Sequence, residues 1–166
     1  MLSLLAALFG GVMAFLLRKQ PGLPSVFGLF GTVCSAALLL PVAAAGITGA
    51  LEKTHWLLPL DMPLGSFTLG VDALTAFFLL PLLMLGPLAA LYSRGYLRDH
   101  CSSSAEGAYW LFFNILFASM TLVLCARDGI LFLLAWEAMG ISSFALVAFE
   151  HHDGQARSAS WKYLVA

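Results

Sequence analysis

The stretch from Gly129 to Phe149 reads GILFLLAWEAMGISSFALVAF and decides the fold. It contains one charged residue, Glu137. An α-helix rises about 1.5 Å per residue, so about 20 apolar residues cross the roughly 30 Å hydrocarbon layer of a bilayer. Backbone groups in that layer must satisfy their hydrogen bonds internally, so a continuous apolar stretch crosses it as a helix. We therefore expect a membrane-spanning helix with a carboxyl group near its middle.

The rest of the 166-residue chain has the same apolar character. Hydrophobic residues make up 61% of the chain and charged residues 10%, and the mean hydropathy is +0.92. A soluble domain carries about 25% charged residues, and a disordered segment combines low hydrophobicity with high charge, so both classes are excluded. A net charge of -1, from 8 basic and 9 acidic residues, offers no basic surface for nucleic acid. The composition indicates a polytopic membrane protein.

Uncharged stretches elsewhere in the chain predict further crossings of the same kind. We expect an all-α transmembrane helix bundle with crossings at about residues 2–17, 26–46, 71–91, 108–126 and 129–149. A sixth crossing would begin near Ala159, so we expect the chain to be a fragment of a longer protein or a truncated gene product. Basic residues favour cytoplasmic loops. Arg18 and Lys19, which follow the first crossing, therefore predict an N-terminus on the outside.

Two connections between the crossings differ in composition. Residues 47–70 alternate apolar residues with turn formers, which predicts a short hairpin or cap on the outer face. Residues 93–106 are polar and serine-rich, which predicts a solvated inner loop. Trp110, close to that loop, is expected at headgroup level, where amphipathic rings gather. Gly28 and Gly31 are expected to allow close packing between helices.

Glu137 is the most informative residue. It follows Gly129 by eight positions, so it lies about 12 Å into the layer, close to the middle. A charged side chain at that depth costs from about 2.5 to more than 10 kcal/mol, so we expect it to face protein or a hydrated cavity. A carboxyl group balanced between desolvation and a basic partner can load and release a proton near neutral pH. The alternative is a structural carboxylic acid that stays protonated between helices.

Three other residues are weaker candidates for proton transfer. Lys162 begins a short apolar run, and it either snorkels to the interface or points inward as a relay group. His151 follows the inner end of the Glu137 helix, where it is either solvated or exchanges protons at the cytoplasmic mouth. Asp72 lies at the start of the third crossing, where a helix N-terminus favours negative charge. Capping is therefore favoured over proton transfer at Asp72.

The sequence contains no catalytic or metal-binding pattern. It shows no P-loop, dinucleotide fingerprint, paired CxxC or serine-nucleophile motif. Cys34, Cys101 and Cys125 lack the spacing of metal ligands, and we interpret the two within crossings as small apolar residues. We predict no catalytic residue, no metal ligand and no cofactor in this chain.

Several segments together resemble one family of membrane proteins. They are Leu131–Val147 with its Trp136-Glu137 pair, Val71–Phe78, Tyr92–Leu97, Trp110–Asn114, Ala118–Met120, Ala148–His151 and Trp161–Ala166. These segments resemble the proton-conducting antiporter-like subunits of respiratory complex I, Mrp-type antiporters and energy-converting hydrogenases. Within that superfamily they are most similar to hydrogenase-4 component B and formate hydrogenlyase subunit 3. Residues 69–166 carry the resemblance, whereas residues 1–68 match mainly in hydropathy, so we divide the chain there.

The resemblance implies a fold, a role and partners. Family members contain inverted repeats, each with a broken helix, and their fifth-helix glutamate, here Glu137, pairs with a lysine on the seventh helix. The chain would then be a non-catalytic, multi-pass subunit of an oxidoreductase complex in the inner (plasma) membrane. Its partners would be other membrane subunits and a peripheral redox arm that holds a nickel–iron centre and iron–sulfur clusters.

Two alternatives to this role remain open. One is a subunit of an Mrp-type cation/proton antiporter, which would exchange ions without redox partners. The other is a truncated membrane scaffold that transports nothing. Both are compatible with the helical pattern, so the choice depends on what Glu137 does and on which subunits accompany the chain.

Overall fold

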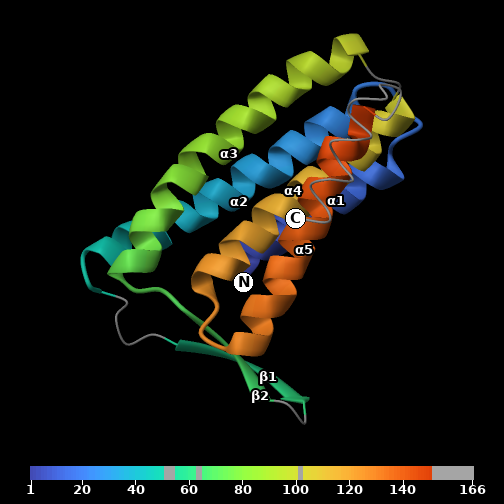
Figure 1. Cartoon of the computed structure of the whole chain (residues 1–166). Coiled ribbons are helices and arrows are strands. Elements are labelled where there is room, and N and C mark those ends of the chain that lie inside the picture. The colour runs from blue at the N-terminus through green and yellow to red at the C-terminus, as the bar shows by residue number, and fades with distance from the viewer. Residues whose placement is uncertain (51–54, 63–64, 101–102, 151–166) are drawn as a thin grey trace.

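The computed structural model describes residues 1–50, 55–62, 65–100 and 103–150 (Figure 1). Its elements, in chain order, are α1 (Leu2–Leu16), α2 (Leu23–Ile47), β1 (His55–Met62), β2 (Gly65–Gly70), α3 (Ala73–His100), α4 (Ser103–Cys125), α5 (Gly129–Val147) and a 3-10 turn, η1 (Ala148–Glu150). Within these residues α2 to α5 are long and apolar enough to cross a membrane, and α1 is a shorter apolar helix. The predicted all-α polytopic bundle is confirmed.

The five helices run alongside one another, and the hairpin of β1 and β2 lies at one end of the bundle (Figure 1). Two helices are central: α2 packs against α1, α3 and α4, and α4 packs against α1, α2 and α5. The helix α5 lies at the edge, with α4 as its main neighbour and smaller contacts to β2 and η1. The described part of the chain therefore covers one side of α5 only.

Glycines set the close approach of the central helices. A Cβ atom added at Gly31 in α2 would lie 2.7 Å from the Cα of Gly10 in α1, and one added at Gly28 would lie 2.3 Å from the Trp110 ring. Helices in a bilayer gain little from hydrophobic exclusion, so small residues that permit backbone contact stabilise their packing. The predicted close-packing role of Gly28 and Gly31 is confirmed.

Trp110 contradicts the expectation that it lies among the lipid headgroups. Its side chain is fully buried, and it forms one core cluster with Ala14, Ala90 and Leu97. The ring fills the space left by the missing side chain of Gly28, and its indole N–H donates to a serine hydroxyl at 3.1 Å. A position near a helix end favours the headgroup layer only when the ring faces outward, and this ring faces the bundle.

The pairing of β1 with β2 between α2 and α3 confirms the hairpin predicted for residues 47–70, and its location on the outer face stays a prediction. Its strands pair antiparallel, with Trp56 opposite Leu69 and Leu58 opposite Phe67. Leu69 also forms an isolated bridge with Ala126 in the turn between α4 and α5. The hairpin is thereby tied to that turn.

The predicted inner loop at residues 93–106 is wrong. The helix α3 continues to His100, and α4 already begins at Ser103. Ser93 and Leu97 are buried within this stretch, and the Ser93 hydroxyl donates to the Ala89 carbonyl at 2.8 Å. Hydropathy marks the hydrocarbon layer but not the ends of a helix, because charged and polar residues with good helix propensity continue it into the aqueous phase. The outside location of the N-terminus stays a prediction.

Candidate proton-transfer site

The helix α5 carries the candidate site and is anchored at its start. Asp128 is its N-cap, and its carboxylate accepts hydrogen bonds from the backbone N–H groups of Ile130 at 2.9 Å and Leu131 at 3.2 Å. An aspartate directly before a helix satisfies N–H groups that lack an intrahelical partner. The aspartate directly before the apolar stretch could therefore have predicted this helix start from the sequence alone.

Glu137 lies on the exposed side of α5. Leu133 and Ile141, one turn before and one turn after it, are 63% and 57% exposed, and Trp136 beside it is 52% exposed. Only Ala135 and Ser142 are buried in this helix. The side of α5 that carries Glu137 therefore faces away from α1 to α4.

Glu137 makes no hydrogen bond or ion pair within the described part of the chain. The Ser142 hydroxyl, nearby on α5, donates to the Ala138 and Met139 carbonyls of its own helix, at 2.7 and 3.1 Å. The position of Ser142 within a membrane-spanning segment predicts a hydrogen bond to another helix, and that prediction is wrong, because both of its acceptors lie in α5. A carboxylate at this depth is costly without a polar neighbour, and α1 to α4 supply none to Glu137.

A second carboxylate, Glu106, was missed in the sequence because it falls in the predicted loop. It lies in the first turn of α4 and is only 7% exposed. Ser25 of α2 donates its hydroxyl hydrogen to Glu106 Oε1, and the Trp110 indole N–H donates to the same Ser25 hydroxyl at 3.1 Å. Ser25, Glu106 and Trp110 form a buried polar cluster. Ser25 is 81 residues from Glu106 and 85 residues from Trp110, so no local sequence pattern reveals the cluster.

Asn114 extends the polar contacts between α2 and α4. Its side chain is fully buried; the amide donates to the Gly28 carbonyl at 3.1 Å and to the Trp110 carbonyl at 2.9 Å. Its carbonyl oxygen accepts from the Thr32 hydroxyl at 3.2 Å. Every buried side-chain nitrogen and oxygen in the described residues has a partner. These interior polar groups therefore hold the helices together.

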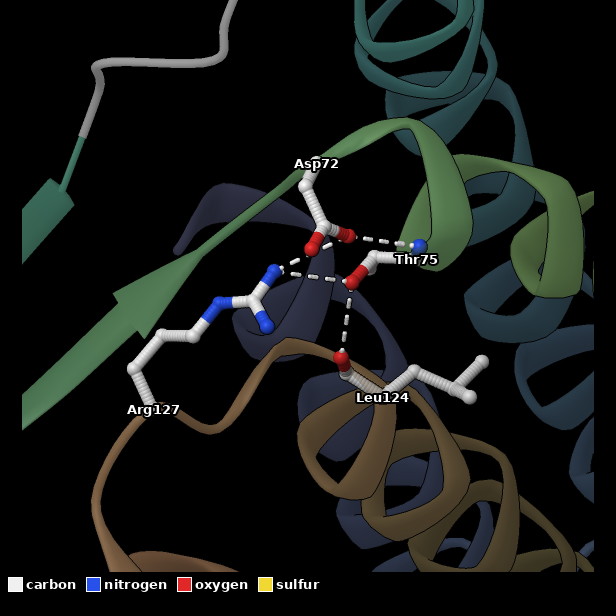
Figure 2. Close-up of polar contacts among 4 residues, drawn as sticks. All are labelled: Asp72, Thr75, Leu124 and Arg127. Atoms are coloured by element: carbon white, nitrogen blue, oxygen red, sulfur yellow. Dashed lines mark hydrogen bonds and ion pairs between the residues drawn. The ribbon is translucent and has the colours of Figure 1, made fainter.

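At the hairpin end, Asp72, Thr75 and Arg127 form what we call the clasp (Figure 2). Asp72 caps α3, accepting from the Thr75 backbone N–H at 2.7 Å, and forms an ion pair with Arg127 at 3.0 Å. Arg127 also donates to the Thr75 hydroxyl at 3.0 Å, and that hydroxyl donates to the Leu124 carbonyl at the end of α4, at 3.2 Å. The predicted capping role of Asp72 agrees with this geometry.

The clasp lowers the pKa of Asp72 from its ordinary value of 3.8 to about 2. The main cause is the backbone N–H of Thr75, and the Arg127 guanidinium acts in the same direction. Hydrogen bonds and a positive charge both favour the ionised form of a carboxyl group. Asp72 is therefore ionised over the whole physiological pH range and does not exchange protons there.

The other candidates for proton transfer, His151 and Lys162, fall outside the described residues, as does Cys101. Cys34 and Cys125 are free thiols, the first half-buried and the second buried. Of the candidates for proton transfer, the structure therefore places Glu137 and Asp72, and Asp72 takes the capping role.

The arrangement defines a class: a multi-pass membrane bundle with a satisfied polar interior and, within the described residues, an unpaired carboxyl on one exposed helix face. No family model matches the sequence. NADH-quinone oxidoreductase subunit L of Mycobacterium tuberculosis is 30% identical over 99 residues, which cover 60% of this chain and 15% of that protein. Hydrogenase-4 component B of Escherichia coli is 36% identical over 80 residues, covering 48% of this chain and 12% of that protein.

A solved structure and a further relative agree with these matches. The membrane-bound sulfane sulfur reductase, an archaeal respiratory membrane complex, contains a chain that matches 98% of this one with a TM-score of 0.72 and 28% identity, over 24% of its own length. A Rhizobium meliloti protein, named as a component of a probable K(+)/H(+) antiporter, is 30% identical over 150 residues, covering 88% of this chain and 14% of that protein.

The chain is therefore a homologue of the antiporter-like membrane subunits found in multi-subunit respiratory complexes and in cation/proton antiporters. The resemblance seen in the sequence is confirmed at this level. The chain spans only 12% to 15% of the length of these three curated relatives.

Proposed function

We propose that this chain forms part of a proton-translocating membrane subunit of a hydrogenase-4-like or formate-hydrogenlyase-like complex. Redox reactions in partner subunits would supply the energy, and this subunit would move ions across the inner (plasma) membrane. The homology to hydrogenase-4 component B and to respiratory membrane subunits supports this choice. Any nickel–iron centre or iron–sulfur cluster would belong to the partner subunits.

One observation carries the proposal: Glu137 lies mid-way along a membrane helix, on an exposed face, with no partner in α1 to α4. A lipid-facing carboxylate would cost at least about 2.5 kcal/mol. We therefore infer that the face of α5 with Glu137 among apolar neighbours contacts a polar or basic group of another segment or subunit. A carboxyl placed against a basic group changes its charge when that group gains or loses a proton, which is the elementary step of proton transfer.

His151 and Lys162 are further proposed participants in proton transfer. Both follow α5 in the sequence, on the side opposite to the hairpin if the chain crosses as predicted. An imidazole titrates near neutral pH, so His151 could deliver protons to the site. Lys162 would act as a relay only if it points inward and does not snorkel.

The test is the Glu137→Gln substitution in the complex as assembled in its own membrane. Glutamine keeps the shape of the side chain and removes its proton exchange, so we expect assembly to be intact and most proton transport into vesicles to be lost. Glu106→Gln is the matched control, because it makes the same chemical change in the same bundle at a group whose contacts are satisfied. Unchanged transport in Glu137→Gln would reject the proposed function and favour the non-transporting scaffold.

The second candidate function is a subunit of an Mrp-type cation/proton antiporter. The match to the Rhizobium meliloti antiporter component over 88% of this chain favours it. The two candidates differ in their partners, so the purified complex separates them. Nickel found by metal analysis, together with the absorbance of iron–sulfur clusters, supports the hydrogenase-type complex. Metal-free partners and proton exchange driven by a gradient of K⁺ or Na⁺ support the antiporter.

A further inference from the structure

The three-residue turn between α4 and α5 is held more firmly than the helix that follows it. Ala126 bridges to Leu69 of β2, the backbone N–H of Arg127 donates to the Thr68 carbonyl at 2.9 Å, and Asp128 caps α5. The helix α5 itself buries only Ala135 and Ser142. The position of α5 therefore depends strongly on where its first residue is fixed.

The side chain of Arg127 connects that turn to two other helices. Its guanidinium reaches Asp72 at the start of α3 and the Thr75 hydroxyl in the first turn of α3. That hydroxyl in turn donates to the Leu124 carbonyl at the end of α4 (Figure 2). A single side chain thus brings together the beginning of α3, the end of α4 and the beginning of α5. One terminal nitrogen of the guanidinium makes both contacts, because it carries two N–H groups.

From this geometry we propose that Asp72 and Arg127 are positioning residues for Glu137: their ion pair fixes the origin of α5 and so sets the depth and direction at which Glu137 meets its proton-transfer partner. The inference rests on the proposed function of Glu137. Asp72 and Arg127 do not themselves carry protons.

A small displacement at the clasp is enough to matter. Glu137 lies about 12 Å along α5 from its first residue, and an α-helix transmits a tilt at its origin as a displacement of the residues beyond. A misplacement of about 1 Å between reacting groups can lower a rate about 100-fold. We therefore expect a partial loss of the ion pair to reduce proton transport several-fold without stopping it.

The experiment uses side chains that separate the ion pair from the cap. Asp72→Asn removes the charge but keeps a good N-cap residue, and Arg127→Gln removes the cation. Arg127→Lys keeps the positive charge as a conservative variant, and Arg94→Gln, an exposed cation at the opposite end of α3, is the matched control. Each variant is assayed in its own membrane complex for the pH midpoint of proton transport and for the transport rate per assembled subunit.

We expect Asp72→Asn and Arg127→Gln to transport several-fold more slowly and to shift the pH midpoint, because both the distance and the surroundings of Glu137 change. Arg127→Lys should restore much of the rate and the midpoint, and Arg94→Gln should match the unmodified protein. A loss that only follows the amount of assembled subunit, with the midpoint unchanged, would show a purely structural clasp and overturn the inference. Unchanged rates in both clasp variants, beside a strong loss in Glu137→Gln, would overturn it and leave the proposed function standing.

Discussion

Two carboxylates in neighbouring membrane helices have opposite surroundings. Glu106 of α4 is 7% exposed and accepts a hydrogen bond from Ser25, whose hydroxyl also accepts from the Trp110 indole. Glu137 of α5 lies on an exposed face between Leu133 and Ile141 and has no partner among the described residues. The carboxylate in the interior thus has a hydrogen-bond partner, whereas the carboxylate on the exposed face has none among the described residues.

This contrast teaches which acidic residue in a membrane bundle is available for chemistry. In water an exposed carboxylate is ordinary and a buried one is notable, but a bilayer offers no hydrogen bonds to an exposed group. A buried carboxyl with a local partner is then the one that stabilises structure, in keeping with the rule that buried polar groups are hydrogen-bonded. Under the proposed function, the unpaired carboxyl of Glu137 is the one that meets a partner in another segment or subunit.

The largest expected effect concerns packing. It compares a glycine in the bundle interior with a glycine on α5. A Cβ at Gly28 would lie 2.3 Å from the fully buried Trp110 ring, whereas a Cβ at Gly140 on α5 meets nothing within 4 Å. We expect Gly28→Ala to destabilise the protein by about 1–3 kcal/mol through overpacking, and Gly140→Ala to be neutral or slightly stabilising through helix propensity. Thermal unfolding of the purified complex in detergent measures both. Equal losses would show that the face of α5 is packed as tightly as the interior.

The second prediction tests whether Glu106 is structural. Glu106→Gln keeps an acceptor for the Ser25 hydroxyl, so its stability should change little. Glu106→Ala removes that acceptor from a buried site, which costs about 1–3 kcal/mol. Proton transport per assembled subunit should be unchanged in both variants, as measured in the vesicle assay used for Glu137. If Glu106→Gln loses transport as Glu137→Gln does, the distinction between the two carboxylates fails and Glu106 also carries protons.

Local sequence patterns predicted the helices, the hairpin and the cap at Asp72, because each depends on residues close together in the chain. The turn formers at residues 47–70 and the uncharged stretches are such patterns. The extent of α3 and α4 was underestimated, since hydropathy stops at the edge of the bilayer while the helices continue to His100 and from Ser103.

The polar contacts between helices could not be predicted in the same way. Ser25 and Glu106 are 81 residues apart, and Thr32 and Asn114 are 82 apart, so only the packing of α2 on α4 brings them together. The ion pair of Asp72 and Arg127 left a weak signal, because the predicted topology puts both residues, of opposite charge, on the same side of the membrane at helix ends. The depth of Glu137 followed from counting residues, but its exposed orientation required the structure.

The smallest expected effect concerns a third carboxylate, Asp72, which is neither buried nor unpaired. Its pKa is about 2 in the folded protein against an ordinary 3.8, because the Thr75 N–H and Arg127 favour the ionised form. A lowered pKa in the folded state means that the stabilisation is complete above about pH 4 and is lost as the pH falls through about 2. The side chains of Asp72 and Arg127 are 47% and 32% exposed, so solvent limits the gain to less than about 1 kcal/mol.

The contribution of Asp72 to stability is measured by thermal unfolding in detergent, from neutral pH downward, of the unmodified protein and of Asp72→Asn. It is the difference in stability between the two proteins at each pH. The difference should stay constant down to about pH 4 and disappear near pH 2, because the protonated carboxyl no longer attracts Arg127. Glu106→Gln is the control, because it leaves Asp72 and its partners unchanged. The stability of this variant should therefore fall near pH 2 as that of the unmodified protein does. A difference that shows no loss between about pH 4 and pH 2 would mean that the carboxyl of Asp72 has no such partners in the folded protein, because a group with the same pKa in both states contributes no pH dependence. The clasp could then not hold the origin of α5, and Glu137 would depend on contacts outside α1 to α4 for its position as well as for its partner.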